Sequence, residues 1–457
     1  MARPTRFLAR AATAALLTLS AAAATAETLT DALVGAYRTS GILEQQRALL
    51  RVSDEDVAQA VSRLRPVIEY AAGLRTQDPS IPGVARTSGS TSLDASWLLY
   101  DFGATPLAIE GRKEAVLAAR EALRGAEQSV LLQAVSAYVG VLRAQAFVEL
   151  NRSNEQLIRE QLRAAQDRFE VGEVTRTDVS LAEASLAAAQ AAVAAEEGNL
   201  VAARESYKAV VGRYPGSLSP IGGTPQLPQS EAAAIQLART MHPDILQAQR
   251  NVRVAELAVR QADRGLLPQV RATLGTSFDD DGDRNSTAGL TVGGPIYSGG
   301  ALASGIRQAK AQRDATRGSL LTTVRAVEQN LGTDWATLRV ALARRDAASR
   351  GAQAAQLALD GLREELNLGA RTTLDVLDQR QNVLDAQTDR VAAEFDRVLA
   401  SYDILESVGL MTVEHLQLPV VSYDPGAYYN AVEGAPTADV SPRGERLNNV
   451  LRRLGRN

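Results

Sequence analysis

The sequence predicts a mixed α/β chain in which long antiparallel coiled-coil helices carry four β-strands. Three observations predict this fold class: an internal repeat, four short segments that alternate with period two, and helical tracts too long for a compact domain. Only 4% of the 457 residues are aromatic, and the alanine-rich tracts offer few bulky groups for a wide core. Long, thin helical packing suits such a composition.

The first 26 residues are predicted to be a secretory signal peptide. Arg3, Arg6 and Arg10 form a positive leader, an apolar run follows over residues 11–24, and Ala26 ends a small-residue cleavage site. That apolar run is too short to span a membrane as a stable helix. Because the chain contains no cysteine, a lipid anchor on an N-terminal Cys, disulfides and thiolate metal sites are excluded.

Charge and residue types exclude several classes of function. Cleavage before Glu27 removes three of the 49 Lys and Arg residues and leaves 53 Asp and Glu, so the mature chain is acidic. With few aromatics, such a chain is a poor nucleic-acid binder. His242 and His415 are the only histidines and lie far apart in sequence. We therefore predict no enzyme activity, no bound cofactor and no metal-ligand cluster.

The internal repeat gives the chain two halves of similar plan. Residues 97–104 align with residues 294–301, and residues 171–179 align with residues 368–376, both at an offset of 197. A constant offset implies a duplicated unit with rigid spacing. Each half is predicted to contain a helix, a β-hairpin, a very long helix, a glycine turn and a second long helix.

Turn-forming residues set the predicted boundaries. Residues 27–212 form the first repeat and residues 231–409 the second, with a Pro/Gly-rich linker over residues 213–230. Residues 410–457 are expected to be a mobile C-terminal extension. The expected hairpins are residues 67–99 and 269–296, and the expected long helices are residues 105–170, 175–212, 301–367 and 372–408.

The predicted strands alternate between apolar and polar positions. In the clearest one, Val270, Ala272 and Leu274 alternate with Arg271 and Thr273. Each strand has roughly 9–11 residues, the length that a tilted strand needs to cross a bilayer. No segment after the leader has 18 consecutive uncharged apolar residues, so strands rather than helices are expected to span.

Four strands are too few to close a barrel, and open edges are not viable in lipid. If these strands span, several chains must therefore share one barrel. The alternative is two soluble hairpins, each with one face on a core.

The long helices contain apolar positions at coiled-coil spacing. Steps of four and three, and a recurrence every seven residues, predict seams between antiparallel helices, although each stretch alone also fits an ordinary core stripe. The seam residues are Val130, Ala134, Ala137, Val141, Ala144 and Val148, then Leu320, Val324, Val327 and Leu331, and finally Leu384, Val391, Val398 and Leu405.

Gly172 and Gly369 occupy equivalent positions where one long helix must reverse into the next. Glycine is the residue that takes the left-handed conformation ending a helix. Thr175 and Thr372 are plausible N-caps of the returning helices. Asp178 and Asp375 fall in the first turn of those helices, where the helix dipole favours carboxylates. That structural role suffices by itself, so any gating role needs a separate argument.

The doubled Gly-x-x-Thr-x-x-Asp-Val segments, the second continuing as Asp375-Val376-Leu377-Asp378, resemble the TolC-type outer-membrane efflux protein family over residues 28–409. Residues 416–419 and 423–429 resemble members that serve type I protein secretion. The resemblance implies a homotrimer with a 12-stranded barrel in the outer membrane and a helical tunnel crossing the periplasm.

The implied function is a passive export duct for type I protein secretion or small-molecule efflux. The expected partners are outer-membrane lipid, a periplasmic adaptor protein and an inner-membrane ABC or proton-driven transporter. The alternative is a soluble periplasmic coiled-coil adaptor.

The resemblance also implies a periplasmic gate formed by Asp178, Arg371, Asp375 and Asp378. Asp375 and Asp378 are expected to form carboxylate rings that attract cations and bind multivalent ones. The chain departs from the family at Leu366, where an aromatic Tyr is common. The adaptor is expected to dock on the two glycine turns, at Val171, Gly172, Glu173, Leu368, Gly369 and Ala370.

Overall fold

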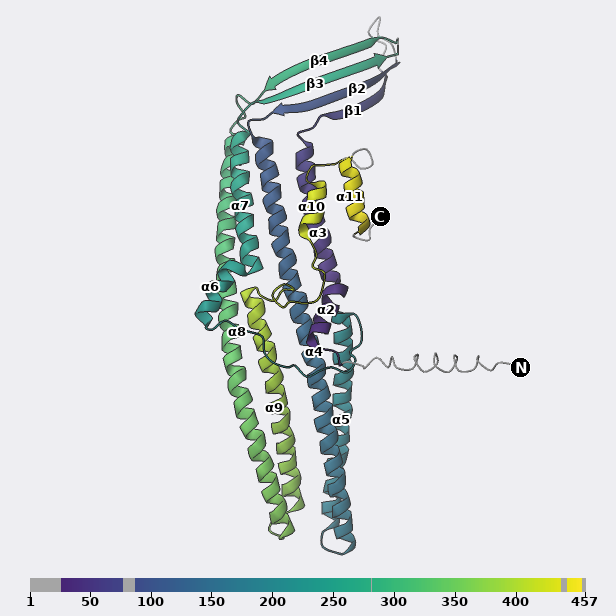
Figure 1. Cartoon of the computed structure of the whole chain (residues 1–457), viewed down its shortest axis with the longest axis vertical. Helices are drawn as coiled ribbons and strands as arrows, with labels where there is room; N and C mark the ends of the chain where they lie inside the picture. The colour runs from purple at the N-terminus through teal and green to yellow at the C-terminus, as the bar shows by residue number, and fades with distance from the viewer. Residues whose placement is uncertain (1–25, 77–86, 281, 437–441, 454–457) are drawn as a thin grey trace, which may run out of the picture. The chain divides into compact units, whose positions relative to one another are not determined.

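The computed structural model describes residues 26–76, 87–280, 282–436 and 442–453. All but the last residue of the predicted signal peptide lies outside the described residues. The first half contains α2 (Leu29–Thr39), α3 (Gly41–Ser62), β1 (Val67–Thr76), β2 (Thr87–Tyr100), α4 (Ala104–Glu170) and α5 (Arg176–Val211). The second half contains α6 (Glu231–Met241), α7 (Pro243–Arg264), β3 (Gln269–Asp279), β4 (Arg284–Gly293), α8 (Ala301–Asn367) and α9 (Thr373–Val408) (Figure 1).

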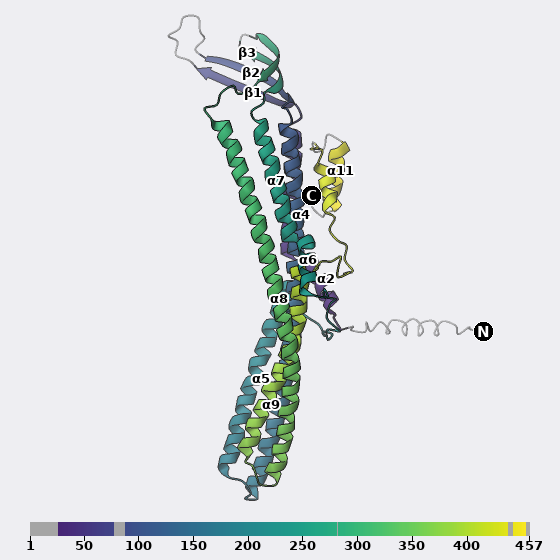
Figure 2. The same cartoon turned by 90° about the vertical axis from the view of Figure 1, so that its left-hand side faces the viewer.

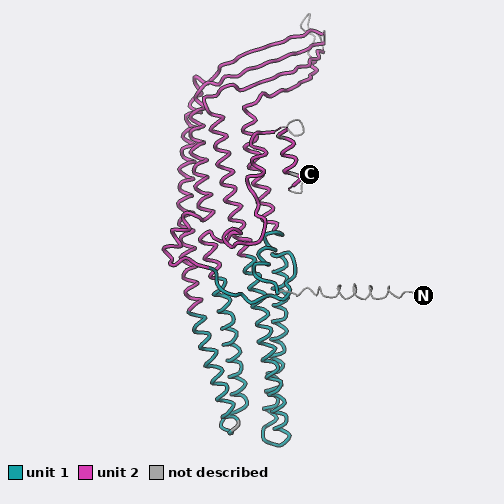
Figure 3. Tube along the Cα trace, in the orientation of Figure 1, with its two compact units in different colours: residues 1–39, 133–225, 343–399 teal, residues 40–132, 226–342, 400–457 magenta. Residues whose placement is uncertain are grey.

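The two halves repeat each other in element order and in length. Helices α4 and α8 each have 67 residues, and the helices that return from them, α5 and α9, each have 36. The chain divides into two compact units, shown in Figure 3, each assembled from both halves. Unit 1 contains residues 1–39, 133–225 and 343–399, and unit 2 contains the remaining residues.

In unit 2 the two hairpins join into one antiparallel sheet with the order β1-β2-β3-β4, which is labelled in Figure 1. Figure 2 shows β1, β2 and β3 from another side. The register places Tyr70 opposite Leu93, Ala95 opposite Leu274, and Leu274 opposite Ala288. Residues directly opposite one another share a face, so the apolar positions paired in this register form one apolar face across all four strands. A β-bulge between Leu98 and Tyr100 interrupts the register at the end of β2, and Leu99, expected on the apolar face, is unpaired there. The other face carries mainly polar residues and glycines, including Glu69 and Asp94.

Neither face of this sheet is covered by a core. Tyr70, Leu74 and Leu290 are 84%, 85% and 66% exposed. The alternative of two soluble hairpins, each with one face on a core, is therefore wrong for the chain as it folds here. Strand β4 ends at Gly293, so Ile296, which we expected in the hairpin, lies beyond it. Pro295 precedes Ile296 and has no N–H to donate to a strand ladder.

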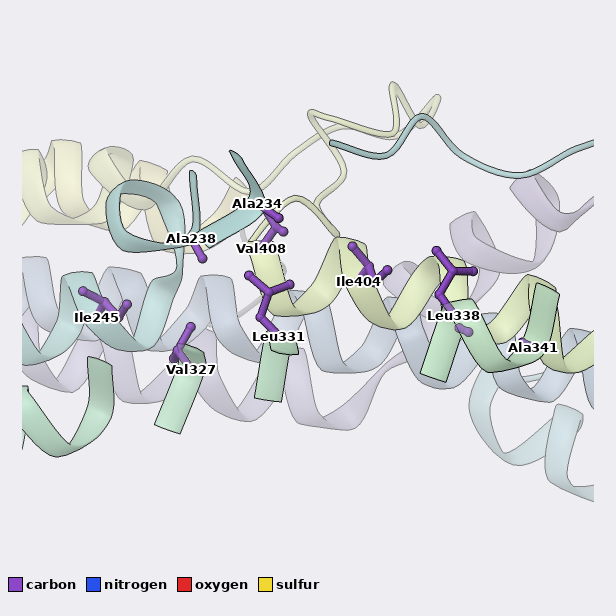
Figure 4. Packing of buried hydrophobic residues seen from close by; sticks show 10 residues of the cluster. Ala234, Ala238, Ile245, Val327, Leu331, Leu338, Ala341, Ile404 and Val408 are labelled. Atoms are coloured by element: carbon purple, nitrogen blue, oxygen red, sulfur yellow. The ribbon is translucent and has the colours of Figure 1, made fainter. Parts of the chain in front are cut away.

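Most of the predicted seam residues are buried, whereas Ala137, Leu320, Val324 and Val391 are half-buried. In unit 1, Val141 packs with Tyr138, Tyr207 and Val211 in a cluster that joins α4 to α5. In unit 2, Leu331 and Val327 of α8 pack against Ile404 and Val408 of α9 and against α6 and α7 (Figure 4). Because Ala234 and Ala238 of α6 have small side chains, α6 can lie close to α8 and α9. One helix among the described residues, α4, has the length and composition to cross a membrane. In the apolar 18-residue window of α4 that meets this criterion, 44% is buried inside the structure.

The sequence analysis expected residues 410–457 to be a mobile extension, and the described part of this segment contains two helices. Residues Pro425–Val432 form α10 and residues Pro442–Arg453 form α11. Tyr428 and Val432 of α10 are buried in a cluster with Ala58 of α3. The Tyr428 hydroxyl donates a hydrogen bond to Glu55, with the two oxygens 2.6 Å apart. Sequence periodicity alone did not indicate this contact of α10 with α3.

Candidate functional site

The two glycine turns at the ends of the helical hairpins in unit 1 have the same geometry. Gly172 has φ +80° and Gly369 has φ +74°, both left-handed. The amide after each glycine donates to a carbonyl five residues back: Glu173 to Arg168 at 2.9 Å and Ala370 to Glu365 at 2.8 Å. These are Schellman motifs, which satisfy the free carbonyls at a helix end. The predicted reversals are therefore confirmed in their backbone conformation.

The side chains flanking the glycines point outward. Val171 is 71% exposed and Leu368 is 84% exposed. A Cβ added at Gly172 or Gly369 would meet no atom within 4 Å, so only backbone strain opposes substitution there. Two large apolar side chains at exposed turn tips fit a contact with another molecule better than a role in this chain's own core.

Each returning helix begins with a reciprocal cap. The Asp178 amide donates to the Thr175 hydroxyl oxygen at 3.3 Å, while the Thr175 amide and hydroxyl donate to Asp178 Oδ2 at 2.9 and 2.7 Å. Thr372 and Asp375 repeat the arrangement at 2.9–3.2 Å. These hydrogen bonds, backbone and side-chain together, lower the pKa of both aspartates below the ordinary value. Both carboxylates are therefore ionised at neutral pH.

The structure shows local partners for three of the four expected gate residues, Asp178, Arg371 and Asp375. Asp375 and Asp378 lie three residues apart on α9, so they share one face about one turn apart. Arg371 pairs with Glu365, with Nε 2.8 Å from Oε2, and this pair lies within its own hairpin. Asp178 is bound by Thr175 of its own cap. Sequence reasoning missed Glu365, because an ion pair across a turn has no sequence period.

A cavity between the two hairpins was also missed by the sequence analysis. It is lined by residues from α4, the first turn, α8 and α9, among them Glu160, Arg168, Arg363 and Arg380. Leu366, which stands where the family often has Tyr, also lines it and packs against the cluster of Leu359, Val376 and Val383. The available signal was Arg380, a charged residue placed four after Val376 and three before Val383 in an apolar seam.

In the part of the chain that the structure describes, no group of three or more His, Cys, Asp or Glu residues is placed to hold a metal ion. The geometry thus consists of outward-facing turns, capped acidic helix starts and a two-faced sheet. Such an arrangement offers exposed surfaces for contacts with other molecules.

Duplicated helical hairpins and an exposed four-stranded sheet fit the class of outer-membrane export channels. The chain belongs to the outer membrane efflux protein family, which it matches over residues 36–213 and 234–410. It is 38% identical over 423 residues to the outer membrane efflux protein BepC of Brucella suis biovar 1 (strain 1330), covering 91% of this chain and 92% of BepC.

More distant relatives also support this family membership. The chain is 27% identical over 273 residues to the outer membrane protein TolC of Escherichia coli (strain K12), a match that covers 55% of each chain. It is 26% identical over 400 residues to the proteases secretion protein PrtF of Dickeya chrysanthemi, covering 80% of this chain and 84% of PrtF. The fold is also that of the Campylobacter jejuni CmeC outer membrane channel, with a TM-score of 0.74, 16% identity and 90% of each chain covered.

These findings confirm the family, the fold class and the outer-membrane location predicted from the sequence. The chain is a subunit of an outer-membrane exit duct for export. A soluble periplasmic adaptor, the alternative, finds no support among these relatives, whose names place BepC and TolC in the outer membrane.

Proposed function

We propose that three copies of this chain close one 12-stranded barrel in the outer membrane, and that their helices continue as a periplasmic tunnel. The observation that carries this proposal is the sheet: it has a continuous apolar face, and among the described residues β1 pairs only with β2 and β4 only with β3. Unpaired backbone groups at such edges are costly in lipid. Four strands are below the minimum of about eight for a closed barrel.

Chemical cross-linking of the full chain in detergent tests this assembly. The expected result is a ladder of covalent species that ends at three chains. A stable monomer that conducts ions in a planar bilayer would contradict the proposal. The two family matches, at residues 36–213 and 234–410, support the accompanying division into repeats at residues 27–212 and 231–409.

The hairpin tips are proposed to form the regulated periplasmic end of the duct. Threefold symmetry would turn Asp375 and Asp378 into two stacked rings of carboxylates, which attract cations and repel anions. The lowered pKa of Asp375 supports this role, because it keeps one ring charged over a wide pH range. Arg371 and Asp178 are proposed to pair across neighbouring hairpins and hold the tips closed.

The exposed turns are the proposed docking site for a periplasmic adaptor, which links the duct to an inner-membrane ABC or proton-driven transporter. Val171 and Leu368 provide apolar contact area, and Gly172 and Gly369 let a partner helix approach the backbone. The duct itself is passive, and the transporter supplies the energy.

Type I protein secretion is the cargo class that we favour. The name of PrtF, with 80% of this chain aligned, supports it, and the name of BepC supports efflux as the second candidate. Expression of this chain in a host that lacks its own export duct separates the two. Restored protease secretion without restored drug resistance supports type I secretion, whereas the reverse result supports efflux.

A further inference from the structure

The cavity between the two hairpins of unit 1 has a volume of about 280 Å³. This is close to the lower end of small-molecule sites, which span roughly 300–1,000 Å³. Its wall combines apolar side chains with four charged ones. The apolar lining includes Leu157, Val174, Leu366 and Val376, and the charged lining is Glu160, Arg168, Arg363 and Arg380. The space is therefore suited to a ligand with both an apolar body and a charged group.

Arg380 is the least expected of these residues. It is only 6% exposed, yet its Nε atom has no hydrogen-bond partner among the described residues. Arginine carries five N–H donors and no acceptor, and a buried donor without a partner is costly. Val376 and Val383 lie about one helical turn before and after Arg380 on α9, and both are buried in the apolar cluster with Leu359. An apolar side chain at position 380 would complete that cluster at lower cost.

The charge around Arg380 is positive in sum. Three guanidinium groups face one carboxylate, that of Glu160. Burial, and to a smaller extent the repulsion from Arg363, lower the pKa of Arg380 to about 10, while Glu160 partly offsets them. Arg380 is thus still charged at neutral pH, and an anion in the cavity would relieve both its desolvation and its repulsion.

We propose that this cavity binds a small organic carboxylate. The carboxylate accepts hydrogen bonds from the guanidinium of Arg380, and the organic body packs on Leu157, Leu366 and Val376. Guanidinium and carboxylate match as a planar, charge-assisted pair, which is the strong form of hydrogen bond. A cation is disfavoured by the three arginines. A fully apolar ligand would leave the buried Nε atom of Arg380 without a hydrogen-bond partner.

Calorimetric titration of the full-length protein in detergent tests the ligand class. Benzoate is the probe, and benzamide is the uncharged control of nearly equal shape. The expected result is saturable binding of benzoate, weakened about tenfold or more by Arg380→Met, with the exposed Arg350→Met on α8 as the matched control. The proposal fails if benzoate does not bind, if benzamide binds equally well, or if Arg380→Met and Arg350→Met have the same effect.

A second measurement tests whether the cavity is open in the assembled protein. The chain has no cysteine, so Arg380→Cys introduces a single reactive thiol. Its labelling rates with anionic sulfonatoethyl and cationic trimethylammonioethyl methanethiosulfonate are each divided by those of Arg350→Cys. Several-fold preference for the anionic reagent is expected, because Arg168 and Arg363 remain. No labelling by either reagent means that a neighbouring chain fills the cavity, and that result, or a cationic preference, overturns the proposal.

Discussion

Arg371 and Glu365 form an ion pair across the second glycine turn, with Nε and Oε2 2.8 Å apart and both side chains about half exposed. An exposed pair contributes only about 0–1 kcal/mol. It therefore holds the turn weakly and leaves Arg371 free to exchange this partner for one on a neighbouring chain.

If Arg371 exchanges Glu365 for a partner on a neighbouring chain, removing Arg371 and removing Glu365 should have different effects on conductance. Arg371→Ser should raise single-channel conductance in a planar bilayer, because it removes a link between neighbouring hairpins. Glu365→Gln should leave conductance at or below the wild-type level, because Arg371 is then wholly available to the neighbour. Equal increases in both variants would show that Arg371 acts only within its own turn.

The acidic positions predict cation selectivity. Replacing Asp375 and Asp378 together by Ala should abolish cation preference and block by trivalent cations, measured as reversal potential and single-channel current. Glu173→Ala, an exposed acidic residue at the other turn, is the matched control and should change neither. Unchanged selectivity in the double variant would return the two aspartates to a capping and solvation role.

The hydrogen bonds of the helix cap predict that cation selectivity is lost when Asp375 is protonated at low pH. The hydrogen bonds from Thr372 lower the pKa of Asp375. The stability that the ionised carboxylate gives to the folded helix start is therefore complete above the ordinary carboxyl pKa, and it is lost as pH falls through the lowered pKa. Thr372→Val should therefore move the loss of cation selectivity to higher pH. Identical pH profiles of selectivity in wild type and variant would contradict this.

The glycine turns predict a variant that assembles and does not export. Gly172→Val with Gly369→Val places β-branched residues at left-handed φ, at a cost of the order of 1–3 kcal/mol each. No neighbouring atom opposes the new side chains, so trimer yield should persist while adaptor docking and export fail. Export at the wild-type rate would place docking elsewhere.

The sheet predicts a face-dependent tolerance of charge. Leu274→Arg or Leu290→Arg should destabilise the barrel by about 2–4 kcal/mol near the bilayer midplane. Thr273→Arg, whose side chain lies on the opposite face, should be mild. Assembly in the outer membrane measures both, and equal tolerance would mean that the apolar face does not contact lipid.

Much of this architecture could be predicted because it is coded locally. The turns depend on glycine, threonine and aspartate at fixed spacing, and the strands on strict alternation, so Gly172, Thr175 and Leu274 could each be interpreted from their neighbours in sequence. The pairing of Arg371 with Glu365, the burial of Tyr428 on α3 and the cavity around Arg380 depend on which side chains tertiary packing brings together. A single sequence without such contacts does not specify them.

The central claim, one barrel shared by three chains, is tested most directly by joining the two free sheet edges. In the cysteine-free chain, Ala71→Cys on β1 is combined in turn with Cys at Thr287, Gly289 and Thr291 on the same polar face of β4. The control is Ala71→Cys with Ser92→Cys, which lie opposite each other within one chain. Oxidation should give covalent trimers for at least one β1–β4 pair and monomers for the control. Only monomers at all three β4 positions, in protein extracted from the outer membrane, would contradict the shared barrel.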